Sequence, residues 1–277
     1  MSVILGIVAA LLIGLSDTSG RASSRRDESS ITHVTTQMAV GTLVALPFVI
    51  VIDSSLIGRD VVAGALSGLF VAIGLALVYR AMADASSAVT APLAGVLAIL
   101  IPLGWDLATG GSLNGLEAAG CAVAIVSLIV VSFDPELGTE RLRRGLGLAT
   151  VGGIFFGLTF TFAGATSEAS GAWPAVFNRG FGLIGIGLLA LTQKAPLLLK
   201  PSVRKFGVLG GFAGALGMLA MILGAQIGSL GTVSVLAGSS PAVVVVLTAV
   251  FDDDKVRWWQ SIGVAGAILG TVLIALG

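Results

Sequence analysis

Ionisable side chains stand inside long apolar runs at two places in this sequence. Asp17 lies deep within the run 3–22, and Arg179 lies near the start of the run 174–193. An ionised group at the bilayer centre costs about 2.5–3.5 kcal/mol on insertion scales, so such residues are candidates for function. As a carboxylate, Asp17 could bind a substrate amine or carry a coupling proton.

Both residues also have a structural interpretation. Asp17 could pair with Arg21, four residues further on, near the membrane surface. Arg179 follows Pro174, which suits a first helical position, and from there its side chain could reach outward to water. The alternative for Arg179 is a cation that faces a pore and binds carboxylate substrates, with Asn178 beside it.

Four further polar residues are candidate contacts for substrate or coupling ion. Gln37 interrupts an apolar run at the position that corresponds to Arg179 in the second half of the chain. Tyr79 and Arg80 close one run, and Gln226 closes another at the position matching Arg80. Simple anchoring of helix ends is the alternative role for Tyr79, Arg80 and Gln226.

The stretch SVLAGSSPAVVVVL is apolar at both ends but poor for a helix in its middle. A proline frees a backbone carbonyl, and in lipid such a carbonyl must find a partner. Broken helices are therefore tolerated where they line a cavity or are buried in protein. We predict a broken, cavity-lining turn at Ser239, Ser240 and Pro241 and assign the same role to Pro92 and Pro102. A packed proline kink is the alternative.

The composition is that of an integral membrane protein. Hydrophobic residues make up 56% of the chain and charged residues 11%, with a mean hydropathy of +1.04. The apolar runs are too long for barrel strands and show no period of two, so the predicted fold class is all-α. We predict ten transmembrane helices, at 3–22, 34–52, 61–80, 86–105, 114–133, 145–165, 174–193, 206–226, 231–250 and 258–276.

Several function classes find no support in the sequence. The net charge is zero, which gives no indication of a nucleic-acid partner. The single cysteine, Cys121, cannot form an intramolecular disulfide. The single histidine, His33, has no nearby ligand set, so we expect no metal. Without a catalytic or cofactor-binding motif, we predict neither an enzyme nor a cofactor.

The ten runs divide into two related sets of five. One matched segment begins at Tyr79 and the other at Ala225, and each has a tight turn, small polar residues and then a proline. We therefore predict two five-helix repeats, residues 1–137 and 138–277. Because each has an odd number of helices, the second is inverted in the membrane relative to the first.

The end of the chain, DKVRWWQSIGVAGAILGTVLI, resembles the closing segment of the EamA-type branch of the drug/metabolite transporter superfamily. That pattern has an acidic residue, a basic one, a glutamine and two glycines seven apart. Its positions are taken here by Asp254, Lys255, Gln260, Gly263 and Gly270. The segment LVYRAMADASSAV is similar to the family's Tyr-x-Ala-Leu turn, with Met82 in the leucine place.

The first half departs from that pattern at three positions. Asp106 is displaced by the insertion ATGGSLNG, Glu117 stands where glutamine is common, and Ser127 replaces the second glycine. These differences concern the packing of the fifth helix.

The resemblance implies a secondary transporter with alternating access about a central cavity surrounded by helices 1, 3, 4, 6, 8 and 9. We predict the export of an amino acid or a similar small metabolite. A cation or multidrug exporter is the first alternative, and a non-transporting membrane enzyme or scaffold is the second. The expected partners are the small-molecule substrate and membrane lipid, and a homodimer is left open.

Lys and Arg are distributed unevenly among the predicted connections. Only Arg59 follows an even-numbered helix, whereas the connections after odd-numbered helices hold Arg21, Arg25, Arg26, Arg80, Arg141, Arg143, Arg144, Lys194, Lys200, Arg204, Lys205, Lys255 and Arg257. Cytoplasmic loops are enriched in these residues. We therefore predict a multi-pass protein of the cell membrane with both termini outside the cytoplasm, although the resemblance implies termini inside.

Overall fold

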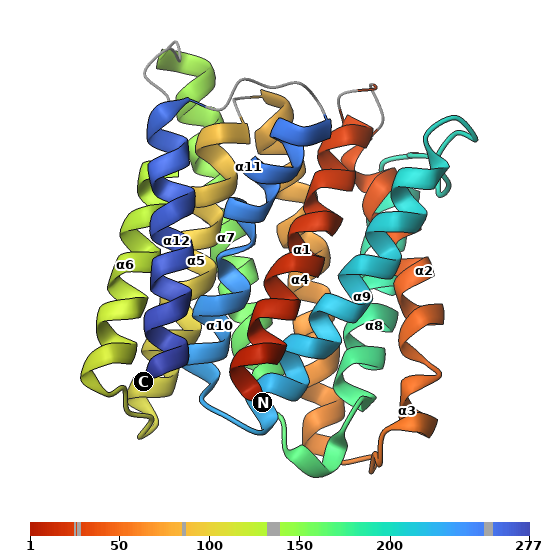
Figure 1. The fold of residues 1–277 in the computed structure, drawn as a ribbon. Helices are drawn as coiled ribbons and strands as arrows, with labels where there is room; N and C mark the ends of the chain where they lie inside the picture. Colours follow the sequence, from red (N-terminus) through yellow and green to blue (C-terminus); the bar gives the residue numbers. More distant parts are fainter. Residues whose placement is uncertain (25, 27–28, 85–86, 132–138, 252–256) are drawn as a thin grey trace.

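The protein is a bundle of helices that lie side by side, with both termini at the same end (Figure 1). The computed structural model describes residues 1–24, 26, 29–84, 87–131, 139–251 and 257–277, and these contain no strand. The elements are α1 (Ser2–Ser24), α2 (Ser30–Ala45), α3 (Phe48–Val51), α4 (Gly58–Asp84), α5 (Ser87–Ala108), α6 (Gly115–Val131), α7 (Thr139–Gly164), the 3₁₀ turn η1 (Glu168–Ser170), α8 (Trp173–Thr192), α9 (Arg204–Gln226), α10 (Leu230–Gly238), α11 (Ser240–Phe251) and α12 (Trp258–Leu276).

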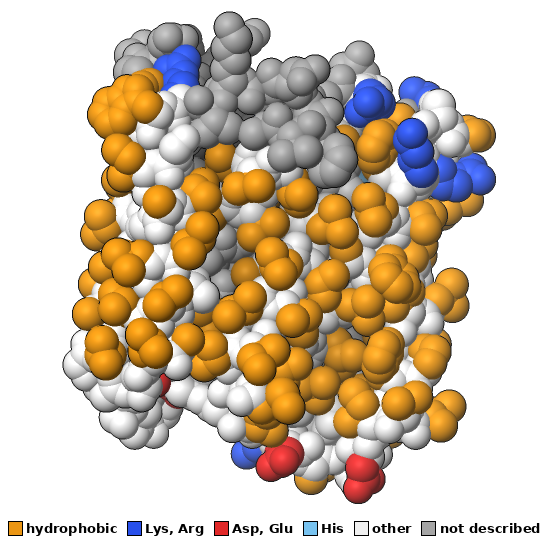
Figure 2. Space-filling view, in the orientation of Figure 1, with side chains coloured by type: hydrophobic (Ala, Val, Ile, Leu, Met, Phe, Trp, Pro, Cys, Tyr) orange, Lys and Arg blue, Asp and Glu red, His pale blue; other side chains and the backbone are white. Residues whose placement is uncertain are grey.

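The described residues contain eight apolar helical stretches long enough to cross a membrane. Two shorter apolar helices, Leu93–Ala108 and Gly115–Val130, occupy the positions of the fourth and fifth predicted segments. Hydrophobic side chains cover the broad middle of the face in Figure 2, and Lys and Arg gather at the end opposite the termini. The all-helical membrane class is thus confirmed, while the count of ten crossings stays a prediction.

Prolines interrupt the predicted segments at some positions and not at others. α10 ends at Gly238 and α11 begins at Ser240, so the predicted break at Ser239 is present. A second break separates α2 from α3 at Pro47, which the sequence analysis did not single out. By contrast, α5 is continuous through Pro92 and Pro102, so the break predicted in that segment is absent.

Glycines let the helices approach until backbone meets backbone, as is typical of membrane bundles. At the crossing of α6 and α12, a Cβ on Gly270 would lie 2.8 Å from the carbonyl oxygen of Gly120. At the crossing of α4 and α8, a Cβ on Gly68 would lie 2.1 Å from the carbonyl oxygen of Asn178. Glycine is therefore required at these contacts because no side-chain atom fits between the two backbones.

Asp106 ties the end of α5 to the start of α10. Its carboxylate oxygen accepts a hydrogen bond of 2.8 Å from the Ser229 hydroxyl and one of 3.0 Å from the Gly231 amide. A carboxylate at a helix N-terminus also interacts favourably with the helix dipole. The acid that departs from the family pattern thus fastens two neighbouring helices. Asp254 and Lys255 of the resemblance lie outside the described residues.

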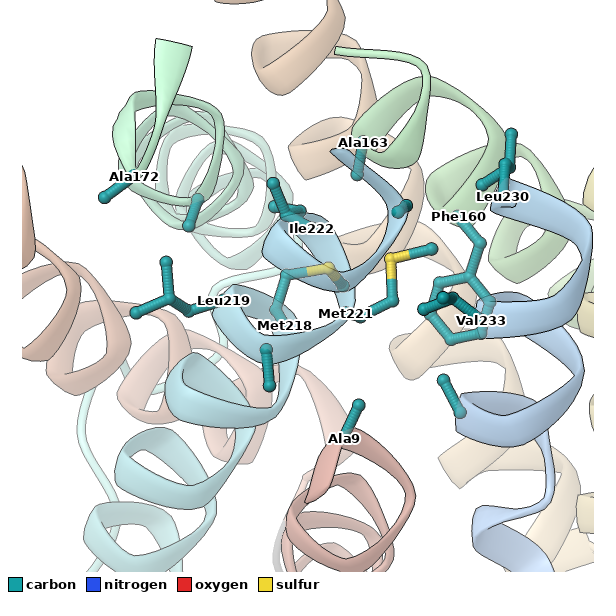
Figure 3. Packing of buried hydrophobic residues seen from close by; sticks show 14 of the residues in the cluster. Ala9, Phe160, Ala163, Ala172, Met218, Leu219, Met221, Ile222, Leu230 and Val233 are labelled. Atoms are coloured by element: carbon teal, nitrogen blue, oxygen red, sulfur yellow. The ribbon is translucent and has the colours of Figure 1, made fainter. Parts of the chain in front are cut away.

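Buried apolar side chains form a cluster near the end of the bundle that carries the termini, and Figure 3 shows how they pack. The cluster joins α1, α7, α8, α9 and α10 through Ala9, Phe160, Ala163, Ala172, Met218, Leu219, Met221, Ile222, Leu230 and Val233, among others. Because methionine and leucine fill this space, no polar side chain of the cluster offers a path for a solute there. We call it the apolar plug.

The crossing of α6 and α12 provides a test of the packing. We expect Gly270→Ala to lower the unfolding temperature in detergent, because overpacking costs about 1–3 kcal/mol. The matched control is Gly187→Ala, also in a helix interior, where an added Cβ would meet nothing within 4 Å. The control should unfold at or slightly above the wild-type temperature, since alanine favours helix over glycine. Equal shifts in the two variants would contradict this account.

Candidate functional site

A central cavity lies in the bundle and is bounded by α1, α2, α4, α5, α7, α8, α9, α10 and α11. Its walls are formed by Ile13, Ser16, Asp17, Gln37, Val71, Leu75, Val78, Gly95, Ala98, Phe156, Phe160, Arg179, Gly214, Met218, Gly238, Ser240, Pro241 and Val244. About 70 Å³ is open to the centres of water-sized molecules. One water needs roughly 10–15 Å³ on this measure, so a few waters or a small solute group fit in this state.

Asp17 faces this cavity from α1. Its side chain is half-buried, and no ion pair joins it to Arg21 among the described contacts. The surface pair considered from the sequence is therefore not formed here. A carboxylate that faces a cavity without a fixed cationic partner is free to bind a solute.

Arg179 reaches the same cavity from α8 and is only 3% exposed. Its guanidinium donates a hydrogen bond to the carbonyl oxygen of Gly214 on α9, and Nη1 lies 3.6 Å from the sulfur of Met38 on α2. The side chain therefore points into the bundle and does not reach outward to water. Its Nε has no hydrogen-bond partner, so the guanidinium keeps donor capacity for a ligand.

Gln37 joins α2 to α1 and α9 at the cavity wall. Its Nε2 donates to the Ser16 hydroxyl at 2.5 Å, and that hydroxyl donates to the carbonyl oxygen of Gly210 at 2.9 Å. The Oε1 atom of Gln37 is buried without a partner. The network is possible because α9 presents glycines here: a Cβ on Gly210 would lie 2.3 Å from the Ser19 hydroxyl.

The break between α10 and α11 contributes to the cavity on one side only. Gly238, Ser240 and Pro241 line it, whereas Ser239 lines an apolar crevice between α1, α10, α11 and α12. The ring of Pro241 packs on α5, where a Cβ on Gly95 would lie 3.0 Å from its Cγ. The prediction for Ser239 is thus corrected, because successive residues of a helical turn point about 100° apart. The side chain of Pro92 lies outside the described part of the chain.

Other predicted site residues lie away from the cavity wall. Tyr79 is buried beside it, where its hydroxyl interacts electrostatically with Asp17 and Arg179. Asn178 donates to the Ser67 hydroxyl at 2.9 Å and so joins α8 to α4. Arg80 is exposed at the end of α4.

Gln226 has a structural role at the end that carries the termini. Its amide donates to Thr166 Oγ1 at 3.1 Å and to the carbonyl oxygen of Gly171 at 3.2 Å, so it holds the end of α9 against the loop before α8.

Comparison with known proteins shows which proteins share this architecture. Residues 143–276, from α7 to α12, match the model of the EamA-like transporter family. This second half of the chain is therefore similar to the EamA-like transporter family. A solved structure titled "Crystal structure of protein" is 18% identical, with a TM-score of 0.74 over 99% of this chain and 96% of that one, which shows a shared fold. No match was found among curated proteins.

The structure also brings forward residues that the sequence analysis underrated. His33 is fully buried on α2, and Ser16 and Ser19 of α1 lie beside the same glycines of α9. The signal in the sequence was the run THVTTQ at 32–37, which is polar yet entirely buried. Within the described residues, no group of three or more His, Cys, Asp or Glu side chains could hold a metal ion.

Neighbouring serines at the break between α10 and α11 allow a direct test of the cavity. In a Cys121→Ala background, we expect Ser240→Cys to react with a water-soluble methanethiosulfonate roughly tenfold faster than Ser239→Cys, because only a hydrated thiol ionises readily. Labelling is measured by mass spectrometry. An apolar maleimide delivered through detergent serves as the control and should modify Ser239→Cys. Equal reactivity of both variants toward the water-soluble reagent would contradict the assignment.

Proposed function

We propose that this protein is a secondary transporter that moves an amino acid or a similar small zwitterionic metabolite by alternating access through the central cavity. The observation that carries the proposal is the presence of Asp17 and Arg179 on one cavity wall without an ion pair between them. A substrate with an ammonium and a carboxylate group offers a partner to each of the two residues.

Electrostatics favours such a substrate over a singly charged one. A buried charge without a partner costs several kcal/mol, so the cavity with both charges present binds a zwitterion best. The planar guanidinium of Arg179 suits a carboxylate, and the carboxylate of Asp17 suits an ammonium group. The remaining wall, including Leu75, Phe156 and Phe160, is apolar and can contact an aliphatic or aromatic side chain of the substrate.

The helix contacts support two inverted repeats with ten crossings. α1 packs on α9 as α7 packs on α4, α2 packs on α9 as α8 packs on α4, and α1 packs on α10 and α11 as α7 packs on α5. In the same scheme α6 packs on its counterpart α12, and α2 on its counterpart α8. Each predicted membrane segment can therefore be exchanged with the segment five places later in the count of ten without changing the pattern of contacts, as expected for repeats 1–137 and 138–277.

Alternating access has a structural basis at the two ends of the cavity. Phe160 and Met218 belong both to the cavity wall and to the apolar plug, so the plug forms the floor of the cavity toward the termini. The break at Ser239 lies where α10, part of the plug, meets α11, part of the wall. We infer that the two halves of this broken helix move separately when the plug opens.

A cation or multidrug exporter is the second candidate. Asp17 together with Phe156 and Phe160 would also suit an apolar cation, since aromatic faces attract positive charge. In that case Arg179 would repel the substrate, which makes the two candidates separable by mutation.

The substrate class is tested with matched ligands. We expect purified wild-type protein in vesicles to transport a neutral amino acid better than the corresponding amine or carboxylic acid. Asp17→Asn should weaken recognition of the ammonium group and Arg179→Gln that of the carboxylate, each by about 2–5 kcal/mol, the cost of removing one partner of a buried charge pair. Each variant should then prefer the ligand that lacks the group it no longer binds.

The controls for this experiment are Glu168→Gln and Arg59→Gln, which remove exposed charges at the end that carries the termini. Both should transport like the wild type. Wild-type selectivity in Asp17→Asn would refute the role of the acid, and a gain of amine transport without loss of amino acid transport in Arg179→Gln would favour the multidrug alternative.

Orientation is the second part of the proposal. The described Lys and Arg residues outside the helix interiors gather at the end opposite the termini (Figure 2). Arg59, at the start of α4, lies at the other end. By the positive-inside rule, the termini then face away from the cytoplasm and the apolar plug closes the outer side of the cavity.

Cysteine labelling tests the orientation. In a Cys121→Ala background, Ser2→Cys and Gly277→Cys should both react with a membrane-impermeant maleimide on intact cells, because both lie on the side poor in Lys and Arg. Lys194→Cys, at the basic end, is the control and should react only after lysis. The reverse pattern would place the termini in the cytoplasm.

A further inference from the structure

Unpartnered polar atoms gather between the central cavity and the basic end of the bundle. Both ring nitrogens of His33, the hydroxyl of Tyr79 and Oε1 of Gln37 are buried without a hydrogen-bond partner. His33 is 0% exposed and Tyr79 is 1% exposed. Buried polar groups in proteins are nearly always paired with protein or with water, so this cluster requires partners.

These side chains form one contiguous group. The rings of His33 and Tyr79 meet edge to face, with centroids 5.6 Å apart. A Cβ on Gly210 of α9 would lie 3.5 Å from Nε2 of His33 and 3.5 Å from Nε2 of Gln37, so both side chains lie over the same glycine. Gln37 also lines the cavity, which connects the group to Asp17 and Arg179.

The helices around His33 contribute few charges. The ring of Tyr79 on α4 and the glycine backbone of α9 at 210 lie against His33, and Asp17 of α1 and Arg179 of α8 interact electrostatically with Tyr79. Along α2, His33 lies three residues after Ser30, or roughly 5 Å from the basic end of the helix. Gln37 lies one turn deeper. The group therefore spans the distance from that end to the cavity.

The chemistry of the group selects its occupant. An imidazole and a phenol can each donate and accept, whereas the amide oxygen of Gln37 only accepts. A fixed ion can serve only as a partner for donors or only as a partner for acceptors, whereas a water molecule can both donate and accept. We propose that His33, Tyr79 and Gln37 line a hydrated proton path between the basic face and Asp17, with His33 as the residue that is protonated and deprotonated, which makes the proton the coupling ion of the proposed transporter.

The proton transfer needs no other reactant. Imidazole of His33 takes a proton from water at the basic end and becomes imidazolium. It releases that proton through the water chain to the carboxylate of Asp17, which becomes a neutral carboxylic acid. Tyr79 donates and accepts within the chain and is unchanged at the end. Neutral Asp17 binds an ammonium group more weakly, so protonation and substrate release are linked.

Two of the three matching positions in the described part of the other half are apolar. In the repeat alignment, Gln37 corresponds to Arg179 and Tyr79 corresponds to Ala225. The offset that relates Gln37 to Arg179 relates His33 to Ala175. Both alanines are buried in the apolar plug. Proton entry is thereby limited to the basic end, as a coupled transporter requires if protons are not to leak through.

The chain has one histidine and one tyrosine, so each gives an unambiguous signal in magnetic resonance. With the full-length protein in nanodiscs and ¹⁵N-labelled histidine, we expect the His33 signal to exchange with water and to change with pH, because the ring takes up and releases a proton. The ring signals of Tyr79 should change over the same pH range. A His33 signal that is constant with pH and isolated from water would overturn the proposal, whatever the substrate is.

A transport measurement forms the second arm. In vesicles with an internal pH dye, His33→Gln should bind the amino acid like the wild type but lose substrate-driven proton movement. Thr42→Val is the control, because it removes only a hydroxyl bonded at 2.8 Å to the Met38 carbonyl of its own helix. Proton movement retained in His33→Gln would overturn the path. Absence of amino acid binding in the wild type would instead contradict the proposed function, and the resonance arm would still decide the path.

Discussion

The guanidinium of Arg179 inside a lipid-embedded bundle is the constraint on which the rest of the structure depends. A charged group there requires partners that lipid cannot supply. Gly214 of α9 supplies one such partner, because its carbonyl oxygen accepts a hydrogen bond from the guanidinium. Gly41 of α2 leaves room for the side chain, since a Cβ there would lie only 3.0 Å from Cδ of Arg179. The close approach of α2, α8 and α9 follows from this requirement.

The same constraint explains why several polar groups of the cavity wall gather near Arg179. Ser16 and Gln37 share the α9 glycines with Arg179, so hydrogen-bonding groups concentrate where α1, α2, α8 and α9 meet. Across the cavity, Phe156 and Phe160 of α7 and Val244 of α11 present only apolar surface. A solute with charges at one end and an apolar group at the other matches this division.

The two ends of the bundle differ although the helix contacts are alike in both halves. Toward the termini, α9 carries Met218, Met221 and Ile222 into a tightly packed cluster. Toward the basic end, α4 carries Tyr79 into a cluster with His33 and unpartnered polar atoms. Similar backbone arrangements therefore carry an apolar cluster at one end and a polar cluster at the other, because the difference lies in the side chains.

The sequence by itself determined the helical membrane class, the approximate extent of the helices, the break at Ser239 and the polar positions Asp17, Gln37 and Arg179. These follow from local properties: run length, hydropathy and the chemistry of proline. The tertiary structure alone decided which polar residues share a cavity. It turned Ser239 away from its neighbour Ser240 and brought the underrated His33 against Tyr79. Helix rotation and glycine contacts between distant segments set these relations, and neither is encoded in the spacing of residues along one run.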